Sequence, residues 1–325
     1  MRLALRPPLF AVAVAFAVAL GTVTAAPASA ADPRDLTDGF YVDPDSTVLQ
    51  WADANPWDGR SIAIRTSIAQ QPMARWFGSW SGTIGTATGA YVGAADYHNK
   101  LPIMVAYNMP GRDACGGHSG GGAGSVSAYN EWIAAYAGGI AKRPAIVVIE
   151  PDALGDYDCM STAQVTERQN MIIGAIAQFN AQAPNTWTYL DAGNPGWTPA
   201  ATMAQRLHAA GIKNAHGFSL NISNYFSTAE NTAYGNAING ELRARYGYTK
   251  PFVIDTSRNA NGSASTPWCN PAQQKTGATS RSGGGAEMLL WIKTPGESDG
   301  NCGVGSGSTA GQFLPQVAYS MVFGY

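Results

Sequence analysis

The stretch AIVVIEPDAL, residues 145–154, decides how this chain folds. Its opening residues, 145–149, are apolar and mostly β-branched, which predicts a buried strand. Glu150, Pro151 and Asp152 follow at once, and the proline ends the strand because it has no N–H to donate to a neighbour. Two carboxylates at the carboxyl end of a buried strand are typical of the catalytic face of an α/β barrel. The alternative is structural: one acid caps the next helix and the other pairs with an arginine.

The first 30 residues have the three parts of a secretory signal peptide. Arg2 and Arg6 make a basic start, residues 9–20 form an apolar run, and Ala28-Ser29-Ala30 forms a cleavage site. The apolar run is too short for a spanning helix, so we prefer this interpretation to a retained membrane anchor. We expect a secreted, extracellular protein that is cleaved near Ala30 and has no contact with membranes.

The composition limits the classes of partner. Charged residues make up 13% of the chain, the formal net charge is −2, and the sequence has no basic stripe, so nucleic acid is not an expected partner. The chain has 38 glycines and 9 tryptophans. Glycines allow long shaped loops, and exposed indole rings suit the C–H faces of sugars.

All four cysteines, Cys115, Cys159, Cys269 and Cys302, lie in the part expected to be exported. An even number in an oxidising compartment predicts two disulfides, for which three pairings are possible. The sequential order, Cys115–Cys159 and Cys269–Cys302, would contribute roughly 3–4 kcal/mol per bridge on the chain-entropy model. A zinc site is disfavoured because there is no C-x-x-C motif and the histidines are scattered. We expect no metal and no cofactor.

A series of apolar segments predicts strands whose starts recur at the spacing of a strand, a loop and a returning helix. The predicted strands are 102–107, 145–149, 186–190, 217–220, 252–254 and 288–292. Residues 125–140 and 161–182 carry the apolar stripe of an amphipathic helix. Residues 61–73 are helix-like, and 76–80 form a short aromatic strand or turn. The alternation has no linker, which predicts one barrel-like α/β domain over residues 31–325.

Polar or acidic residues follow each predicted strand. In chain order they are Asn108 and Asp113, Glu150 and Asp152, Asp191, residues 221–224, Asp255 and Arg258, and Lys293, Glu297 and Asp299. Parallel strands of a barrel end at one face, so these side chains are expected to line a common cleft. No G-x-S-x-G elbow competes with them, and the glycine run 120–124 lacks the G-K-[ST] ending of a phosphate loop. We interpret that run as a flap beside the site.

Several motifs resemble the signatures of glycoside hydrolase family 6, in the family's order from about residue 40 to the end. They are Tyr107-Asn-Met-Pro-Gly-Arg-Asp113 with Cys115 and its glycine run, Val148-Ile-Glu-Pro-Asp152, Tyr189-Leu-Asp-Ala-Gly193, Ser223-Asn-Tyr225, Asp255-Thr-Ser-Arg-Asn259, Trp268-Cys269 and Lys293-x-Pro-Gly-Glu-Ser-Asp-Gly300. The resemblance implies a distorted, TIM-like (β/α) barrel of about seven parallel strands. It also implies a hydrolase that cleaves β-1,4-glucan, such as cellulose, with inversion at the anomeric carbon.

Two positions depart from the family pattern. Ala114 separates Asp113 from Cys115, where the family usually has the cysteine directly after the aspartate. Asn194 stands where the family usually has histidine. We expect altered flap geometry and altered sugar binding, with the chemistry retained.

The resemblance assigns Asp152 as general acid and Asp113 as the neighbour that raises its pKa and shares the proton movement. Asp299 matches the candidate base, although Arg258 and Lys293 match residues that would hold its carboxylate ionised and weaken it as a base. A relay through Ser223 and a backbone carbonyl is the alternative. Asp191 is expected to support the electrostatics of the acid pair or to make a structural hydrogen bond. Glu150 is expected to support the site from beneath.

The remaining assignments concern substrate binding. Tyr107 is expected under the reactive sugar, and Trp76, Trp197, Trp268 and Trp80 are candidate stacking platforms. Core burial is the alternative for any tryptophan and best fits Trp132 and Trp187. The polar candidates are Asn194, Ser223, Asn224, Lys293 and Glu297.

Short segments after Asp152 and before Lys293 predict an open groove and therefore attack on internal bonds of the glucan. We expect the protein to be a monomer. The alternatives are an exo-acting cellobiohydrolase, a non-catalytic carbohydrate-binding protein on the same scaffold, and a retaining glycosidase on an ordinary eight-stranded barrel.

Overall fold

The computed structural model describes residues 31–263 and 267–325, so the predicted signal peptide lies outside the described residues. Strands and helices alternate along the chain, and the strands form one sheet in the order β1-β2-β3-β4-β5-β6-β8-β7. The strands are β1 Arg75–Phe77, β2 Ile103–Ala106, β3 Ala145–Ile149, β4 Thr186–Asp191, β5 Gly217–Leu220, β6 Phe252–Asp255, β7 Arg281–Ser282 and β8 Met288–Leu290. All neighbouring pairs are parallel except β7 with β8.

The sheet curls into a barrel that lacks a continuous ladder between its first and last parallel strands. One backbone hydrogen bond spans this gap: the N–H of Ala74, before β1, donates to the carbonyl of Trp291, after β8, at 2.8 Å. The parallel strands are therefore β1 to β6 and β8, and the predicted distorted barrel of about seven parallel strands is confirmed. The antiparallel β7 has only two residues and was not expected.

Alternate residues of each strand enter two separate cores. In β3, Ala145, Val147 and Ile149 pack outward against the helices, whereas Ile146 and Val148 point into the barrel. Every residue of this strand is buried because both faces are covered. The sequence of the strand is therefore a continuous apolar run and does not alternate between apolar and polar residues.

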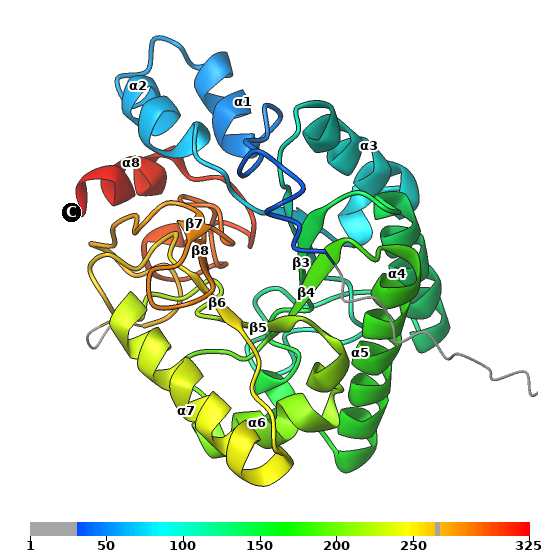
Figure 1. The fold of residues 1–325 in the computed structure, drawn as a ribbon. Coiled ribbons are helices and arrows are strands. Elements are labelled where there is room, and N and C mark those ends of the chain that lie inside the picture. Colours follow the sequence, from blue (N-terminus) through cyan, green and yellow to red (C-terminus); the bar gives the residue numbers. More distant parts are fainter. Residues whose placement is uncertain (1–30, 264–266) are drawn as a thin grey trace, which may run out of the picture.

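The helices surround the sheet. Figure 1 shows α3, α4 and α5 along one side, α6 and α7 along the next, and α1, α2 and α8 grouped together. Their bounds are α1 Thr47–Ala54, α2 Ser61–Ile64, α3 Ile84–Tyr97, α4 Val126–Ile140, α5 Thr162–Gln182, α6 Ala200–Ala209, α7 Thr228–Tyr246 and α8 Pro315–Phe323. Within residues 31–263 and 267–325, no helix has the length and apolar character needed to span a bilayer.

The two helices predicted from their apolar stripes begin after serine caps. Ser125 accepts the N–H of Ala128 at the start of α4, and Ser161 accepts the N–H of Gln164 at the start of α5. The helix expected at 61–73 is shorter: α2 is followed by one π-helical turn, Arg65–Ala69.

Glu150, at the end of β3, fixes the chain that leaves β2. Its side chain is buried, and its carboxylate accepts the N–H of Asn108 at 3.0 Å and that of Met109 at 2.9 Å. Burial raises the pKa of Glu150 to about 7, although these two N–H groups oppose the shift. Glu150 therefore lies beneath the catalytic face and supports the loop that carries Asp113.

Glycines in two helices predict opposite effects of the same substitution. A Cβ at Gly139 in α4 would lie 2.0 Å from Thr88 Oγ1 and 2.5 Å from the carbonyl oxygen of Gly85 in α3, whereas one at Gly174 in α5 would meet nothing within 4 Å. Gly139→Ala should lower the free energy of unfolding by about 1–3 kcal/mol because the helices must separate. Gly174→Ala should raise it by about 0.5–1 kcal/mol. Urea denaturation measures both, and equal effects would contradict the close helix contact.

Glu150 also predicts a pH-dependent stability. Because its pKa is raised from 4.5 to about 7 in the folded protein, the folded state binds its proton more tightly than the unfolded state. The stabilisation is complete below pH 4.5 and is lost as the pH rises through about 7, by on the order of 3 kcal/mol. The free energy of unfolding of the wild type, minus that of Glu150→Gln, should fall over this range. Exposed Glu167→Gln is the control, and a pH-independent difference for Glu150→Gln would refute the assignment.

Candidate active site

A cleft of about 1420 Å³ lies at the carboxyl ends of the strands. Every residue that the sequence singled out for catalysis or sugar binding lines it. These residues are Trp76, Tyr107, Asp113, Asp152, Asp191, Asn194, Trp197, Ser223, Asn224, Trp268, Lys293, Glu297 and Asp299. The structure therefore brings together side chains from all seven parallel strands or from the loops that follow them.

Asp152 follows β3 with a left-handed backbone, φ 70°. Burial raises the pKa of its carboxyl well above the usual value, and the charges of Asp191, Asp156 and Asp113 add to the shift in that order. The sequence predicted that Asp113 would supply this effect, and in the structure burial and two other carboxylates contribute more. A positive φ at a non-glycine residue is unfavourable and is found mainly where function requires it.

Asp191 ends β4 and is buried beside Asp152. Its Oδ2 accepts the backbone N–H of Asp152 at 2.9 Å, and its Oδ1 accepts that of Gly193 at 3.2 Å. Burial raises the pKa of Asp191 to about 6, and these N–H groups partly offset the shift. The two roles proposed for Asp191, structural and electrostatic, are therefore compatible in one residue.

A row of side-chain oxygens joins Asp152 to Asp113. The hydroxyl of Tyr107 lies 3.5 Å from Asp152 Oδ2 and 3.0 Å from the hydroxyl of Ser119. Ser119 donates to Asp113 Oδ2 through its hydroxyl, at 3.1 Å, and through its backbone N–H. The sequence analysis gave Ser119 no role, and no local motif marks it as part of the site.

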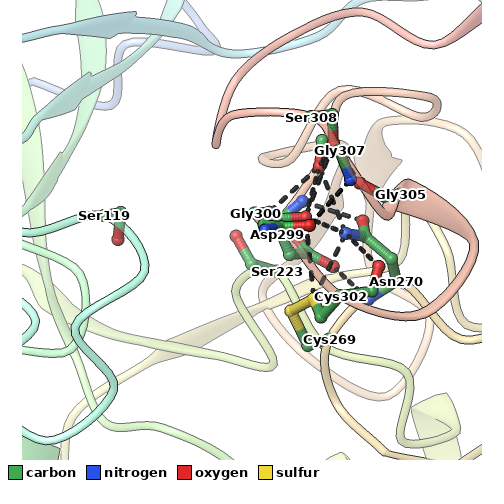
Figure 2. Close-up of a disulfide and its surroundings, with 12 residues drawn as sticks. Ser119, Ser223, Cys269, Asn270, Asp299, Gly300, Cys302, Gly305, Gly307 and Ser308 are labelled. Atoms are coloured by element: carbon green, nitrogen blue, oxygen red, sulfur yellow. Dashed lines mark hydrogen bonds between the residues drawn. A yellow bond between two sulfur atoms is a disulfide. The ribbon is translucent and has the colours of Figure 1, made fainter.

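Asp299 lies on the opposite wall, within the cluster of Figure 2. Arg258 Nη1 is 3.0 Å from its Oδ1, and its Oδ2 accepts the hydroxyl of Tyr225 at 3.2 Å and the N–H of Asn270 at 3.1 Å. Lys293 Nζ is 4.0 Å from Oδ1. These groups stabilise the ionised carboxylate. Among the hydrogen bonds of the described residues, Oδ1 accepts none.

Two of the tryptophans are built into the cleft wall. Trp76 is half-buried, and its Nε1 donates to the carbonyl of Ile292 at 2.8 Å. Its ring meets that of Tyr107 edge to face, with centroids 5.3 Å apart. Trp197 covers Gly155 and Gly193, where a Cβ would come within 2.4 Å and 3.2 Å of its ring.

Of the other four tryptophans named from the sequence, two line the cleft and two belong to the core, as predicted. Trp268 is 45% exposed and Trp80 is 57% exposed, and both line the cleft. The ring of Trp268 lies 5.2 Å from that of His118, centroid to centroid, which connects the loop after β2 with the loop after β6. Trp187 is buried and Trp132 packs against the outer core, so both are core residues.

The buried carboxylate of Asp255 fixes the backbone of two polar candidates, Ser223 and Lys293. Asp255, at the end of β6, accepts the N–H of Ser223 at 3.2 Å and that of Lys293 at 3.0 Å through Oδ2. It therefore fixes the loops that follow β5 and β8. Glu297 accepts the hydroxyl of Thr47 at 3.0 Å, and Asn194 accepts the N–H of Gly196 at the same distance.

The disulfides follow the sequential order, Cys115–Cys159 and Cys269–Cys302. The first joins the loops that carry Asp113 and Asp152, and the second adjoins Asp299. His118, Cys269 and Cys302 are close enough together to suggest a metal site, but the two sulfurs are bonded to each other. The described residues therefore offer no thiolate there.

The residues that sequence reasoning missed are Ser119, Asp156, Arg168, Tyr225 and Asn270. Asp156 and Arg168 are buried and charged, which is the usual sign of a specific partner, but burial is not visible in a lone sequence. Tyr225 and Asn270 directly contact Asp299. Tyr225 ends the motif Ser223-Asn-Tyr225, so its place two residues after Ser223 could have marked it as a residue of the site.

Known proteins resemble this chain over most of its length. The family model described as glycosyl hydrolases family 6 matches residues 37–322. Endoglucanase 1 of Streptomyces halstedii is 69% identical over 309 residues, 95% of this chain and 96% of that protein. Endoglucanase A of Thermobispora bispora is 42% identical over 318 residues, 96% of this chain and 68% of that protein.

Solved structures agree with the sequence comparisons. The endoglucanase Cel6 from Mycobacterium tuberculosis, in complex with methyl-cellobiosyl-4-deoxy-4-thio-β-D-cellobioside, has a TM-score of 0.81 and 37% identity. The match covers 90% of this chain and 99% of that one. A family model that spans almost the whole chain, close relatives and a shared fold all agree, and the chain belongs to glycosyl hydrolases family 6.

Proposed function

We propose that this protein is a secreted endo-β-1,4-glucanase that hydrolyses internal bonds of cellulose and related β-glucans with inversion of anomeric configuration. The observation that carries the proposal is that one cleft lined with tryptophans contains both Asp152, whose carboxyl pKa is raised well above the usual value, and Asp299, which is paired with Arg258. An inverting glycosidase needs one carboxyl that gives a proton and one carboxylate that activates water. The secreted location follows from the predicted signal peptide, and the two disulfides are compatible with it.

Asp152 serves as the general acid. Its raised pKa favours the protonated form, and the leaving glycosidic oxygen needs that proton as the bond breaks. Tyr107 and Ser119 form a path of hydroxyl groups from Asp152 to Asp113, so Asp113 takes part in returning the proton after each turnover.

Asp299 serves as the candidate base. Arg258 Nη1 lies 3.0 Å from Oδ1 of its buried carboxylate, and Tyr225 and Asn270 donate to Oδ2. Asp299 lines the cleft, and this position supports a direct role with a water molecule. The alternative is a water held by Ser223 and a backbone carbonyl, with Asp299 supporting it electrostatically.

The tryptophans and short loops support attack within a polymer. Trp76, Trp197 and Trp268 all line one cleft, where their rings can stack on sugar rings of a chain. After Asp152 the chain makes only the 3-10 turn Gly155–Cys159 before α5 begins at Thr162. This segment is too short to form a roof over the cleft, and internal bonds of a glucan remain accessible.

The central test is hydrolysis of a soluble β-1,4-glucan. The wild type should release reducing ends while the viscosity of the solution falls early, which distinguishes internal cleavage from exo action. Asp152→Ala should lose about 10²- to 10⁴-fold in kcat because the leaving oxygen is no longer protonated. Proton NMR should show the α-anomer first. Binding without hydrolysis would support the carbohydrate-binding alternative, and an initial β-anomer would indicate a retaining enzyme.

A second test concerns Asp299. Asp299→Ala should abolish most activity, and azide should restore part of it because the small anion occupies the space of the lost carboxylate and attacks directly. Asp299→Asn, which leaves no such space, is the matched control and should not respond to azide. Inactivity of the folded Asp299→Ala variant at every azide concentration would favour the relay through Ser223.

A further inference from the structure

A buried ion pair lies beneath the two loops that carry the acids. Arg168 comes from α5 and Asp156 from the 3-10 turn after Asp152, and both side chains are 2% exposed. Arg168 Nη1 is 3.9 Å from Asp156 Oδ2. Two charges so deeply buried lose most of their hydration, so a pair of this kind is weak evidence of a purely stabilising role. Its other contacts indicate what it does.

The pair holds the loop after β2 on both sides of Asp113. Arg168 Nη2 donates to the carbonyl of Gly111 at 2.7 Å, and Asp156 Oδ2 accepts the N–H of Ala114 at 2.7 Å. Ala114 is the residue that separates Asp113 from Cys115 in this sequence. The extra residue therefore has a specific partner in the fold.

The same pair also holds the loop after β3. Arg168 Nη1 donates to the carbonyl of Ala153 at 3.4 Å, next to Asp152. The N–H of Asp156 donates to the carbonyl of Asp152 at 3.1 Å, which closes the turn on which the acid lies. The disulfide Cys115–Cys159 links the same two loops farther out.

We propose that Asp156 and Arg168 are positioning residues that fix the separation of Asp113 and Asp152 by binding the backbone of both loops. The proposal rests on the proposed function, since it concerns the geometry of those two acids. Neither residue is placed in contact with substrate: each acts through the loop that it holds. A guanidinium suits this role because its planar fork donates to two carbonyls at once, which an ammonium group matches poorly.

The charge of Asp156 has a second effect on the acid. Asp152 is faced by Asp191 from β4, by Asp113 and Tyr107 from the chain after β2, and by Asp156 from its own turn, while Arg168 faces Asp156. Burial, Asp191, Asp156 and Asp113 together raise the pKa of Asp152. Removal of the Asp156 charge therefore lowers that pKa.

The test compares two neighbouring aspartates. Asp156→Asn keeps an oxygen that accepts the N–H of Ala114 but removes the charge, so the alkaline limb of kcat should move to lower pH by about half a unit or more. The KM for a soluble β-1,4-glucan should change less than about twofold, since no sugar-binding residue is altered. Asp158→Asn, whose side chain is 70% exposed and pairs with Arg206, is the control and should leave the limb in place.

A second variant tests the loop contact without relying on activity. Asp156→Ala removes the acceptor of the Ala114 N–H, so amide hydrogen exchange in residues 107–124 should become faster, whereas Asp158→Ala should not change it. Its kcat should fall about tenfold. Unchanged exchange in Asp156→Ala would overturn the positioning role, and an unmoved alkaline limb in Asp156→Asn would overturn the effect of the Asp156 charge on Asp152. If wild type then still hydrolyses glucan and Asp152→Ala does not, the proposed function stands.

Discussion

The reluctance of a buried carboxyl group to ionise is the constraint on which the site depends. Five carboxyl groups gather around the end of β3, and four of them accept a backbone N–H: Asp113 from Ser119, Glu150 from Asn108 and Met109, Asp156 from Ala114, and Asp191 from Asp152. Each of these N–H groups stabilises a negative charge. Among the described contacts, the side chain of Asp152 accepts only the hydroxyl of Tyr107, at 3.5 Å. Asp152 is therefore the carboxyl of this group whose negative charge is least stabilised by hydrogen bonds.

The opposite wall of the cleft has the reverse electrostatics. Asp299 is buried, and it is surrounded by Arg258, Lys293, the hydroxyl of Tyr225 and the N–H of Asn270. One fold thus gives two aspartates opposite surroundings: carboxylates lie around one, and cations and hydrogen-bond donors lie around the other. Asp255 connects this wall to the barrel, since it binds backbone N–H groups after both β5 and β8.

The sequence predicted the strands better than the helices because β3 and its neighbours are short, apolar and β-branched. It predicted α4 and α5, whose apolar stripes and serine caps are local, but not α3, which has glycines at 85, 89 and 93 and packs closely on α4. The cleft-lining residues were also predictable, because strand ends meet at one face. What the sequence did not predict are the contacts between loops, such as that of Ser119 with Asp113 or of Arg168 with Gly111. These depend on where chain segments from different strands come to lie in space, and no local pattern encodes that.

The placement of the disulfides has a mechanical consequence. Cys115–Cys159 ties together loops on the wall of the acid, and Cys269–Cys302 ties together loops on the wall of Asp299, so each wall is rigid within itself. Between the walls, the ring contact of His118 with Trp268 joins the loops without a covalent bond. A stiff polysaccharide strand that is cut in its middle enters a cleft from the side. The cross-links lie within each wall and not across the cleft, so they preserve the spacing of the reacting groups without closing that side to the strand.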